Sequence, residues 1–315
     1  MVTAHLRVGA GVSRVAAIDR GTNSIRLLVT DISEGVQTDL DRRMEIVRLG
    51  QDVDRTGRLA PEALARTFAA LATYTEAIVT LGAESVRFVA TSATRDAANR
   101  DEFVHGVTRL LGVAPEVASG DEEARLSFVG ATRGLPESIA APYLVVDIGG
   151  GSTELVVGAD RPHSAFSADV GSVRLTERRL LDDPPTADQV AMARADIEAA
   201  LDDASRHVTL RDAASLIGVA GSVTTVAGIH LGLRAYDSAA IHHSRVPAEA
   251  VRRISDQLLE ADHAERAAIP VIHPGRVDVI AAGALVLRCV VDRAGVDEVV
   301  VSEHDILDGI AWGLV

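Results

Sequence analysis

Two short turns carry residues that could hold a phosphate. The segments 18–29 and 146–157 share the pattern apolar, Asp, x, Gly, x, x, Ser, and Asp147 lies 128 positions after Asp19. Glycine lets the backbone approach a ligand closely, and successive N–H groups in such a turn suit a phosphate oxygen. The aspartate before each turn could hold Mg²⁺ or a water molecule. Two such turns facing each other across a cleft would clamp a phosphate chain; the alternative is a pair of ordinary hairpin turns.

Other residues could complete a site that hydrolyses a phosphoanhydride. This chemistry needs a carboxylate that orients or activates water, and positive charge on the transferred phosphoryl group. Glu122 and Glu123 lie near the start of an expected helix, where adjacent side chains point about 100° apart, so only one can enter a cleft. Taken alone, such a pair is usually solvated. Arg95 follows a Ser/Thr-rich turn and would either contact phosphate or pair with Asp96 or Asp101.

The composition excludes several classes of protein. The 315 residues include 45 Asp and Glu against 31 basic residues, all of them Arg, and the formal net charge is −14. Without lysine the chain cannot be a Schiff-base enzyme, a pyridoxal-phosphate enzyme or a P-loop NTPase. An acidic surface repels DNA and anionic lipid, so we expect neither nucleic acid nor membrane as a partner. The single Cys289 excludes an intrachain disulfide, and the adjacent His242 and His243 do not form a zinc motif.

Strands and helices alternate through most of the chain, which predicts an α/β fold. We expect strands at 15–19, 25–31, 44–49, 86–91, 143–147, 153–157, 214–219 and 296–301, and helices at 61–81, 101–111, 172–181, 186–207, 277–292 and 304–313, with further helices after Gly120, Gly221 and Pro247. At about 150 residues per domain the length predicts two domains. We place them at 1–130 and 131–303, with a last helix, about 304–315, that can pack back on the first.

Targeting signals are not apparent in the sequence. Residues 1–14 have no long apolar run of the kind found in a signal peptide. The most apolar stretch, 277–291, is interrupted by Asp278 and Arg288 and falls short of the roughly 18 residues that span a bilayer. We therefore expect a cytoplasmic protein.

Four motifs together resemble those of one known family. Residues 17–27, 90–95, 119–126 and 146–154 are similar, in this order, to motifs of the exopolyphosphatase/guanosine pentaphosphate phosphatase (Ppx/GppA) family, of the actin/hexokinase/Hsp70 superfamily. The resemblance implies two duplicated actin-like (ribonuclease H-like) domains with a cleft between them. With the glycine-rich segment 218–225 it covers nearly the whole chain, which looks like a short member without the C-terminal helical extension of long members. Arg20 departs from the family, which usually has a small or apolar residue there; it would either help hold the anion or point away.

The resemblance also implies roles for individual residues. Glu123 would be the base that activates water, and Arg95 would contact the phosphoryl group. The metal side would be Asp19 and Asp147, assisted by Glu154, with Mg²⁺ or Mn²⁺ as the cofactor. The substrate-binding residues would be those of the two turns and of the third glycine segment: Gly21, Thr22, Asn23, Ser24, Gly149, Gly150, Gly151, Ser152, Thr153, Gly221 and Ser222.

The implied activity is removal of terminal phosphate from inorganic polyphosphate. Hydrolysis of guanosine pentaphosphate (pppGpp) at its 5′ end is the near alternative; a kinase or a nucleotide-switch protein of the same superfamily is more distant. Guanosine or adenosine polyphosphates are expected as substrates or regulators, and the assembly as a homodimer. We expect short chains to be preferred, because the acidic surface repels a long tail and Arg174, Arg178 and Arg179 supply at most a short basic track.

Overall fold

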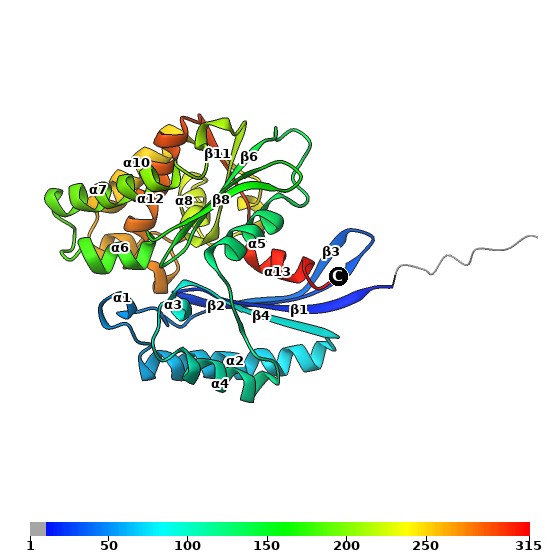
Figure 1. Cartoon of the computed structure of the whole chain (residues 1–315). Helices are drawn as coiled ribbons and strands as arrows, with labels where there is room; N and C mark the ends of the chain where they lie inside the picture. The colour runs from blue at the N-terminus through cyan, green and yellow to red at the C-terminus, as the bar shows by residue number, and fades with distance from the viewer. Residues whose placement is uncertain (1–10) are drawn as a thin grey trace, which may run out of the picture.

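The first α/β unit is built on the hairpin that carries Asp19. The computed structural model describes residues 11–315. The first sheet has the strand order β3-β2-β1-β4-β5, in which β1, β2 and β3 are antiparallel and β4 and β5 join in parallel. Its strands are β1 Ser13–Arg20, β2 Ser24–Ser33, β3 Val36–Ile46, β4 Ser85–Ala90 and β5 Glu116–Val117. The helices of this unit are α1 Val53–Thr56, α2 Pro61–Leu81, α3 Ser92–Arg95 and α4 Arg100–Leu111, and α2 and α4 cover one face of the sheet (Figure 1).

The second unit repeats this plan on a larger sheet. Its strand order is β10-β11-β9-β6-β7-β8. The strands are β6 Tyr143–Ile148, β7 Thr153–Gly158, β8 Pro162–Ala168, β9 Ser215–Val219, β10 Arg245–Pro247 and β11 Glu298–Val301. The helices are α6 Ser172–Arg179, α7 Ala187–Ala204, α8 Ala220–His230, α9 Ser238–Ile241, α10 Ala248–Glu260, α11 His263–Ala267 and α12 Ile280–Ala294, with 3₁₀ turns η1 Leu210–Asp212 and η2 Pro274–Arg276. The apolar α12 packs with α7, α8 and α10 over one face of the sheet.

The two predicted turns occupy equivalent places in the two sheets. Asp19 in β1 pairs with Arg26 in β2, and Asp147 in β6 pairs with Glu154 in β7. These pairs are separated by the same 128 positions that separate the two turns in the sequence. The repeat therefore extends from residue types to strand register, and each sheet presents its turn at the same end.

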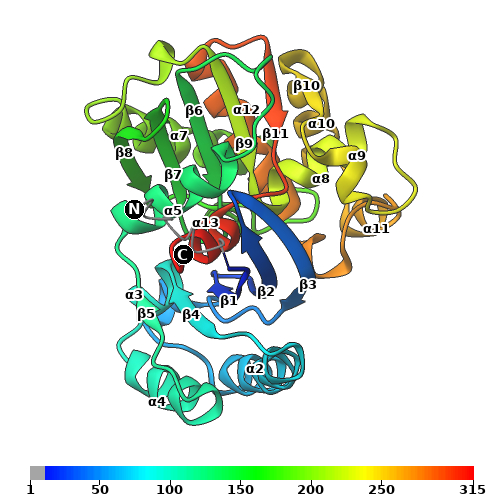
Figure 2. The same cartoon turned by 90° about the vertical axis from the view of Figure 1, so that its right-hand side faces the viewer.

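Two helices cross between the sheets. The helix α5, Gly120–Thr132, packs Ala124 and Phe128 against Val145 and Val156 of the second sheet. The helix α13, Ile306–Trp312, packs on the first sheet, on the face opposite α2 and α4. The two helices contact each other between the sheets (Figure 2). The division that we placed after residue 130 thus falls near the end of a helix that covers the second sheet.

The crossing of α5 and α13 depends on two glycines. A Cβ atom on Gly130 would lie 1.8 Å from the backbone oxygen of Asp305, and one on Gly309 would lie 2.0 Å from the backbone oxygen of Leu126. We expect Gly130→Ala to lower the free energy of unfolding by about 1–3 kcal/mol, because the backbones must separate to make room. Chemical denaturation measures the loss. The control Arg125→Ala, at an exposed position of the same helix, should change it by less than about 0.5 kcal/mol; equal stability of the two variants would contradict this account.

Some predicted elements were wrong in their bounds. The third strand, expected at 44–49, runs over Val36–Ile46, and its exposed, charged residues gave no alternating pattern. The helix expected at 277–292 begins at Ile280, because residues 277–279 form turns that continue from η2, and the last helix begins at Ile306 rather than His304. The strand β8 was not predicted. The expectation about a signal peptide concerns residues 1–14, of which 1–10 lie outside the described residues.

Candidate active site

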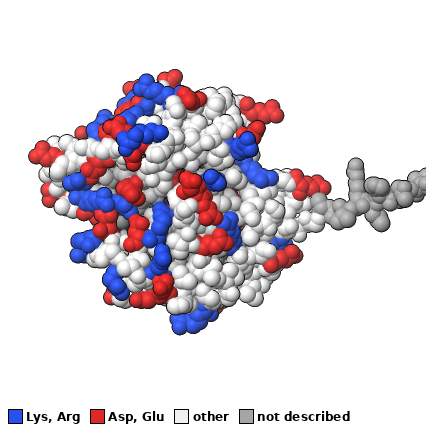
Figure 3. Space-filling model, viewed as in Figure 1, with Lys and Arg blue, Asp and Glu red and all other residues white. Residues whose placement is uncertain are grey.

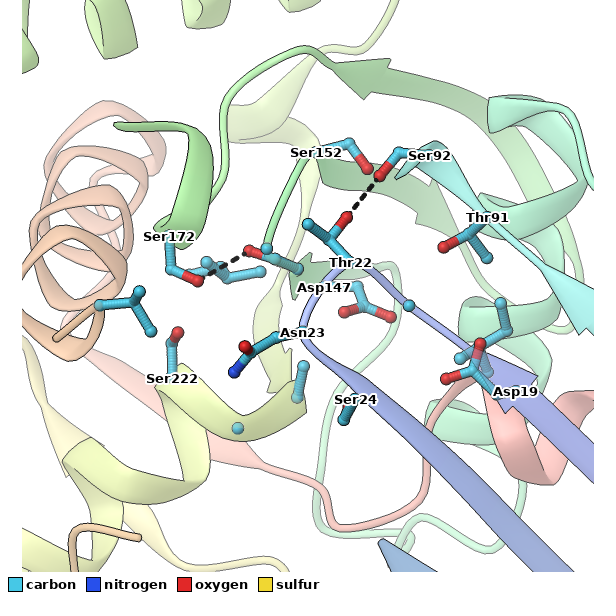
Figure 4. Close-up of a pocket in the computed structure, with 18 of the residues that line it drawn as sticks. Asp19, Thr22, Asn23, Ser24, Thr91, Ser92, Asp147, Ser152, Ser172 and Ser222 are labelled. Carbon is cyan, nitrogen blue, oxygen red and sulfur yellow. Dashed lines mark hydrogen bonds between the residues drawn. The ribbon is translucent and has the colours of Figure 1, made fainter. Parts of the chain in front are cut away.

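A cavity lies where the two hairpin turns face each other (Figure 4). Both units and both crossing helices contribute to its walls. The predicted site residues that line it are Asp19, Gly21, Thr22, Asn23, Ser24, Glu123, Asp147, Gly149, Gly150, Ser152, Gly221 and Ser222. Residues that the prediction did not include are Arg26, Thr91, Ser92, Ser172, Ala220, Arg276, Val279 and Ile280, with Ile148 and Ile306. The cavity therefore brings together segments from nearly the whole length of the chain.

The first turn is held closed by its own backbone and by a neighbouring loop. The N–H of Gly21 donates to the carbonyl of Ser24 at 3.0 Å, and the carbonyl of Asn23 accepts from Val47 and Arg48. The hydroxyl of Thr22 is 2.9 Å from that of Ser92 (Figure 4). This leaves the side chains of Asn23 and Ser24 at the cavity wall.

The second turn requires glycine for close approach. The N–H of Gly149 donates to the carbonyl of Ser152 at 3.0 Å, as in the first turn. A Cβ on Gly150 would lie 2.8 Å from Cβ of Thr22, and one on Gly151 would lie 2.5 Å from Oγ of Ser92. The two turns therefore touch across the cleft, and larger side chains would push the units apart.

Four predicted residues are not among those that line the cavity. Gly151 lines a separate small recess, to which Thr22 and Ser92 also contribute. The buried Thr153 donates its hydroxyl to the carbonyl of Val170 at 2.6 Å. Glu154 is 1% exposed and accepts a hydrogen bond from Ser167 at 2.7 Å. Arg95 donates to the carbonyl of Ala118 at 2.8 Å and to Glu123 at 3.2 Å, so it reaches the cavity through that carboxylate.

The adjacent glutamates of α5 point in different directions. Glu123 is 8% exposed and lines the cavity. Glu122 points away and pairs with Arg87 at 2.7 Å. Burial raises the pKa of Glu123 to about 7, against the opposing effect of Arg95, and the charges of Asp147 and Asp19 raise it further. A carboxyl with a pKa near the working pH is suited to accept a proton from water.

Asp19 is linked through Arg26 to Asp305, at the start of α13. Arg26 donates two hydrogen bonds to Oδ2 of Asp19, at 2.6 and 3.0 Å, and a third to Asp305. Asp305 also caps α13 by accepting from the N–H of Leu307 at 3.0 Å. The other oxygen of Asp19, Oδ1, is buried without a hydrogen-bond partner among residues 11–315. A buried, unpartnered carboxylate oxygen at a cavity wall is a ready ligand for a cation or water.

Asp147 is the corresponding carboxylate of the second unit. Its Oδ2 accepts a hydrogen bond from the buried Ser127 of α5 at 2.5 Å. Burial raises the pKa of Asp147, and the charges of Asp305 and Asp19 add to this effect. Ser127 lies one helical turn after Glu123, so both side chains lie on the face of α5 that meets the cavity end of β6.

Arg276 is a site residue that sequence reasoning missed. Its guanidinium lies against Gly221, since a Cβ built there would be 0.8 Å from Nη1. Within the described part of the chain it has no carboxylate at ion-pair distance, and it lines the cavity. Arg276 ends the turn η2, and no local motif marked it, because this turn approaches the glycine segment at Gly221 only in the folded chain.

The arginines considered for a basic track are already paired. Arg174 bonds to Asp96 at 2.7 Å, Arg178 pairs with Asp54, and Arg179 pairs with Asp196 at 2.7 Å. The first two of these pairs join α6 to the first unit. Across the face seen in Figure 3, acidic and basic side chains are interspersed rather than separated. Arg20, the departure from the family pattern, points away from the cavity and is fully buried.

Among residues 11–315, no helix is both long enough and apolar enough to cross a bilayer.

Comparison with known proteins identifies relatives over nearly the whole chain. The profile of the Ppx/GppA phosphatase family matches residues 28–315. Exopolyphosphatase 2 of Mycobacterium tuberculosis is 49% identical, with 96% of this chain and 98% of that protein covered. Exopolyphosphatase 1 of Mycobacterium leprae is 30% identical, with 94% and 88% covered.

Solved structures agree with this result. The crystal structure of an exopolyphosphatase-like protein superposes with a TM-score of 0.93 at 43% identity, covering 96% of this chain and 98% of the other. A Ppx/GppA family member from Aquifex aeolicus gives a TM-score of 0.80 at 28% identity, covering 96% and 98%. The expected fold, two actin-like α/β domains with a cleft between them, is thereby confirmed.

Proposed function

The chain belongs to the Ppx/GppA phosphatase family, and from this membership we propose that it is an exopolyphosphatase, hydrolysing the terminal phosphate of inorganic polyphosphate. The observation that carries the proposal is the position of Glu123, a buried carboxylate held by Arg95 at the wall of a cavity between two glycine turns. The distant kinase and nucleotide-switch alternatives are set aside, because the two relatives compared above, which are covered nearly throughout, are exopolyphosphatases.

The residues of the cavity account for one hydrolytic step. Backbone N–H groups of the two turns, with Ser222 and Arg276, would hold the phosphate chain. A water oxygen then bonds to the terminal phosphorus while the bond from that phosphorus to the bridging oxygen breaks. Glu123 accepts a proton from the water. The products are inorganic phosphate and a chain that is one phosphate shorter and ends in an anionic oxygen.

We expect the reaction to use Mg²⁺ or Mn²⁺ as the cofactor. Within residues 11–315 no group of three or more His, Cys, Asp or Glu side chains forms a metal cage. The residues present still fit Mg²⁺, which binds through one or two carboxylates together with substrate phosphates. Asp19, with its unpartnered Oδ1, and Asp147 would hold it, and Glu154 would support Asp147 from the paired position of β7. The cation would neutralise charge between these carboxylates and the phosphates.

The charges near the cleft favour short substrates. Arg174 and Arg178 already pair with carboxylates outside the cavity. Of the two arginines that line the cavity, Arg26 binds Asp19 and Asp305. Within the described residues, this leaves Arg276 as the cavity-lining arginine that can bind the phosphate chain. Beyond the cavity an acidic protein with a net charge of −14 repels a polyanionic tail. Hydrolysis of pppGpp is the alternative activity. Assembly as a homodimer and regulation by nucleotides stay predictions.

Phosphate release from substrates of different length tests the proposal. We expect the highest kcat/KM on chains of a few to some tens of phosphates, and a decrease between about 50 and 300 mM salt, because the contacts are ionic. The assay compares short polyphosphate, long polyphosphate and pppGpp at equal Mg²⁺. Faster hydrolysis of pppGpp than of every polyphosphate would favour the alternative. A preference for chains of hundreds of phosphates with processive release would contradict the expected length dependence.

A further inference from the structure

Arg20 is buried in the first unit on the side away from the cavity. Side chains alternate along a strand, so Asp19 faces the cavity and Arg20 faces the layer of α2 and α4. The side chain is 0% exposed, and its guanidinium carbon lies 5.8 Å from the ring centre of Phe103. Two of its nitrogens, Nε and Nη2, have no hydrogen-bond partner among residues 11–315. A buried charged group with missing partners destabilises a fold, so its presence needs an explanation.

Arg20 holds the turn of α3 at two points. Its carbonyl oxygen accepts from the N–H of Thr91 at 3.1 Å, at the start of the turn. Its Nη1 donates to Oγ1 of Thr94 at 3.1 Å, near the end of the turn. Thr94 is itself 0% exposed, and no other hydrogen bond of its hydroxyl occurs within the described part of the chain. The guanidinium is therefore a polar contact that holds this end of α3 on the side away from the cavity, in addition to the bonds that Arg95 and Asp96 make.

The same short turn carries contacts of the active site. Ser92 meets Thr22 of the first glycine turn at 2.9 Å. Arg95, which directly follows Thr94, donates to Glu123 at 3.2 Å and to the carbonyl of Ala118 at 2.8 Å. The helix α3 has only four residues and no side-chain cap at its N-terminus, so it has little stability of its own.

From these contacts we propose that Arg20 is a positioning residue for hydrolysis: through Thr94 it fixes the α3 turn, and thereby the alignment of Arg95 with Glu123. This inference rests on the function proposed above. The unpartnered nitrogens destabilise the fold, whereas the bond to Thr94 supports the reaction. Removing the guanidinium should therefore change stability and activity in opposite directions.

The first test replaces Arg20 with an apolar side chain of similar length. Arg20→Met should raise Tm by on the order of 2 °C or more, because two buried donors without partners are removed. The same variant should lower kcat roughly tenfold, with a smaller change in KM, because the reacting groups are misaligned while the phosphate-binding turns remain. Arg20→Lys, which keeps a donor for Thr94, should retain most of the wild-type kcat. Arg109→Met, which removes a positive charge at an exposed position of the same unit, should leave kcat and KM unchanged.

The second test leaves Arg20 in place and removes its partner. Thr94→Val deletes the hydroxyl in a side chain of the same shape and should reproduce the fall in kcat. The double variant Arg20→Met, Thr94→Val should be no slower than either single variant, because both remove the same bond. Full activity of folded Arg20→Met or of Thr94→Val would overturn the proposal, as would multiplied losses in the double variant or failure of Arg20→Lys to restore kcat.

A readout without substrate separates this inference from the proposed function. The amides of Thr94, Arg95 and Asp96 donate to carbonyls of Thr91 and Ser92 within the turn. Their hydrogen exchange should be faster in Arg20→Met and in Thr94→Val than in the wild type or in Arg109→Met. If the wild type released no phosphate from polyphosphate, the proposed function would fail, and the exchange rates would still decide whether Arg20 fixes the turn. Unchanged exchange in both variants would overturn the inference.

Discussion

Replacing Glu123 with Gln should remove most phosphate release while polyphosphate still binds. The carboxamide has the shape of the carboxylate and its oxygen can accept the hydrogen bond from Arg95, which the native side chain receives at 3.2 Å. It cannot accept a proton from water. Loss of a general base typically lowers the rate on the order of 10²–10⁴-fold, so kcat should fall by that factor and the Kd for polyphosphate should change little.

The adjacent glutamate provides the matched control. Glu122 pairs with Arg87 outside the cavity, so Glu122→Gln should keep near-normal kcat. The pH dependence offers a second check: the pKa of Glu123 is raised to about 7, mainly by burial, and only the ionised form accepts a proton. The wild-type rate should therefore decrease as the pH falls through about 7. A normal rate in Glu123→Gln together with a lost rate in Glu122→Gln would show that the base is the other carboxylate.

Removing divalent cations should lower the wild-type rate by about a hundredfold or more. Asp19, Glu123 and Asp147 surround the cavity, and a phosphate chain adds further negative charge. A bound cation is worth several kcal/mol of charge stabilisation in such a reaction, which corresponds to a factor of this size. The measurement is phosphate release after dialysis against a chelator, followed by titration with Mg²⁺ or Mn²⁺.

Single variants connect this dependence to named carboxylates. Asp147→Asn should raise the Mg²⁺ concentration needed for half-maximal rate, because one anionic ligand is lost. Asp256→Asn, at an exposed ion pair with Arg288, should leave that concentration unchanged. Full activity after thorough chelation would refute the cofactor assignment, and an unchanged Mg²⁺ requirement in Asp147→Asn would refute the role given to that residue.

The sequence predicted the features that local chemistry determines. The turns at Asp19 and Asp147 were recognisable because a glycine turn between two apolar strands is a local pattern, and its repetition at a fixed spacing indicated two related sheets. The helix that carries Glu123 was expected after Gly120, and it spans Gly120–Thr132 with Ser119 as its N-cap. The two turns meet at one cavity because each lies at the equivalent end of its own sheet.

Features that depend on contacts distant in the sequence could not be predicted in this way. Arg26 lines the cavity and binds both Asp19 and Asp305, which comes from the other end of the chain. Arg276 reaches the cavity because Gly221 leaves room for it. The strand β3 was misplaced because its side chains are mostly exposed and show no alternation. None of these relations leaves a mark within a short segment of sequence.

The packing of α13 on the first sheet sets an order for the folding of the nascent chain. The face that includes Val15 and Leu28 is covered by Ile306 and Ile310. During synthesis on the ribosome this sheet emerges first and the helix that covers it emerges last. Domains usually fold as units, beginning with the N-terminal one, but here the first sheet keeps an apolar face in water until the second unit has been made. The nascent protein therefore exposes this apolar face until residues 306–312 have been made, and truncation after residue 303 would destabilise the sheet formed at the opposite end of the chain.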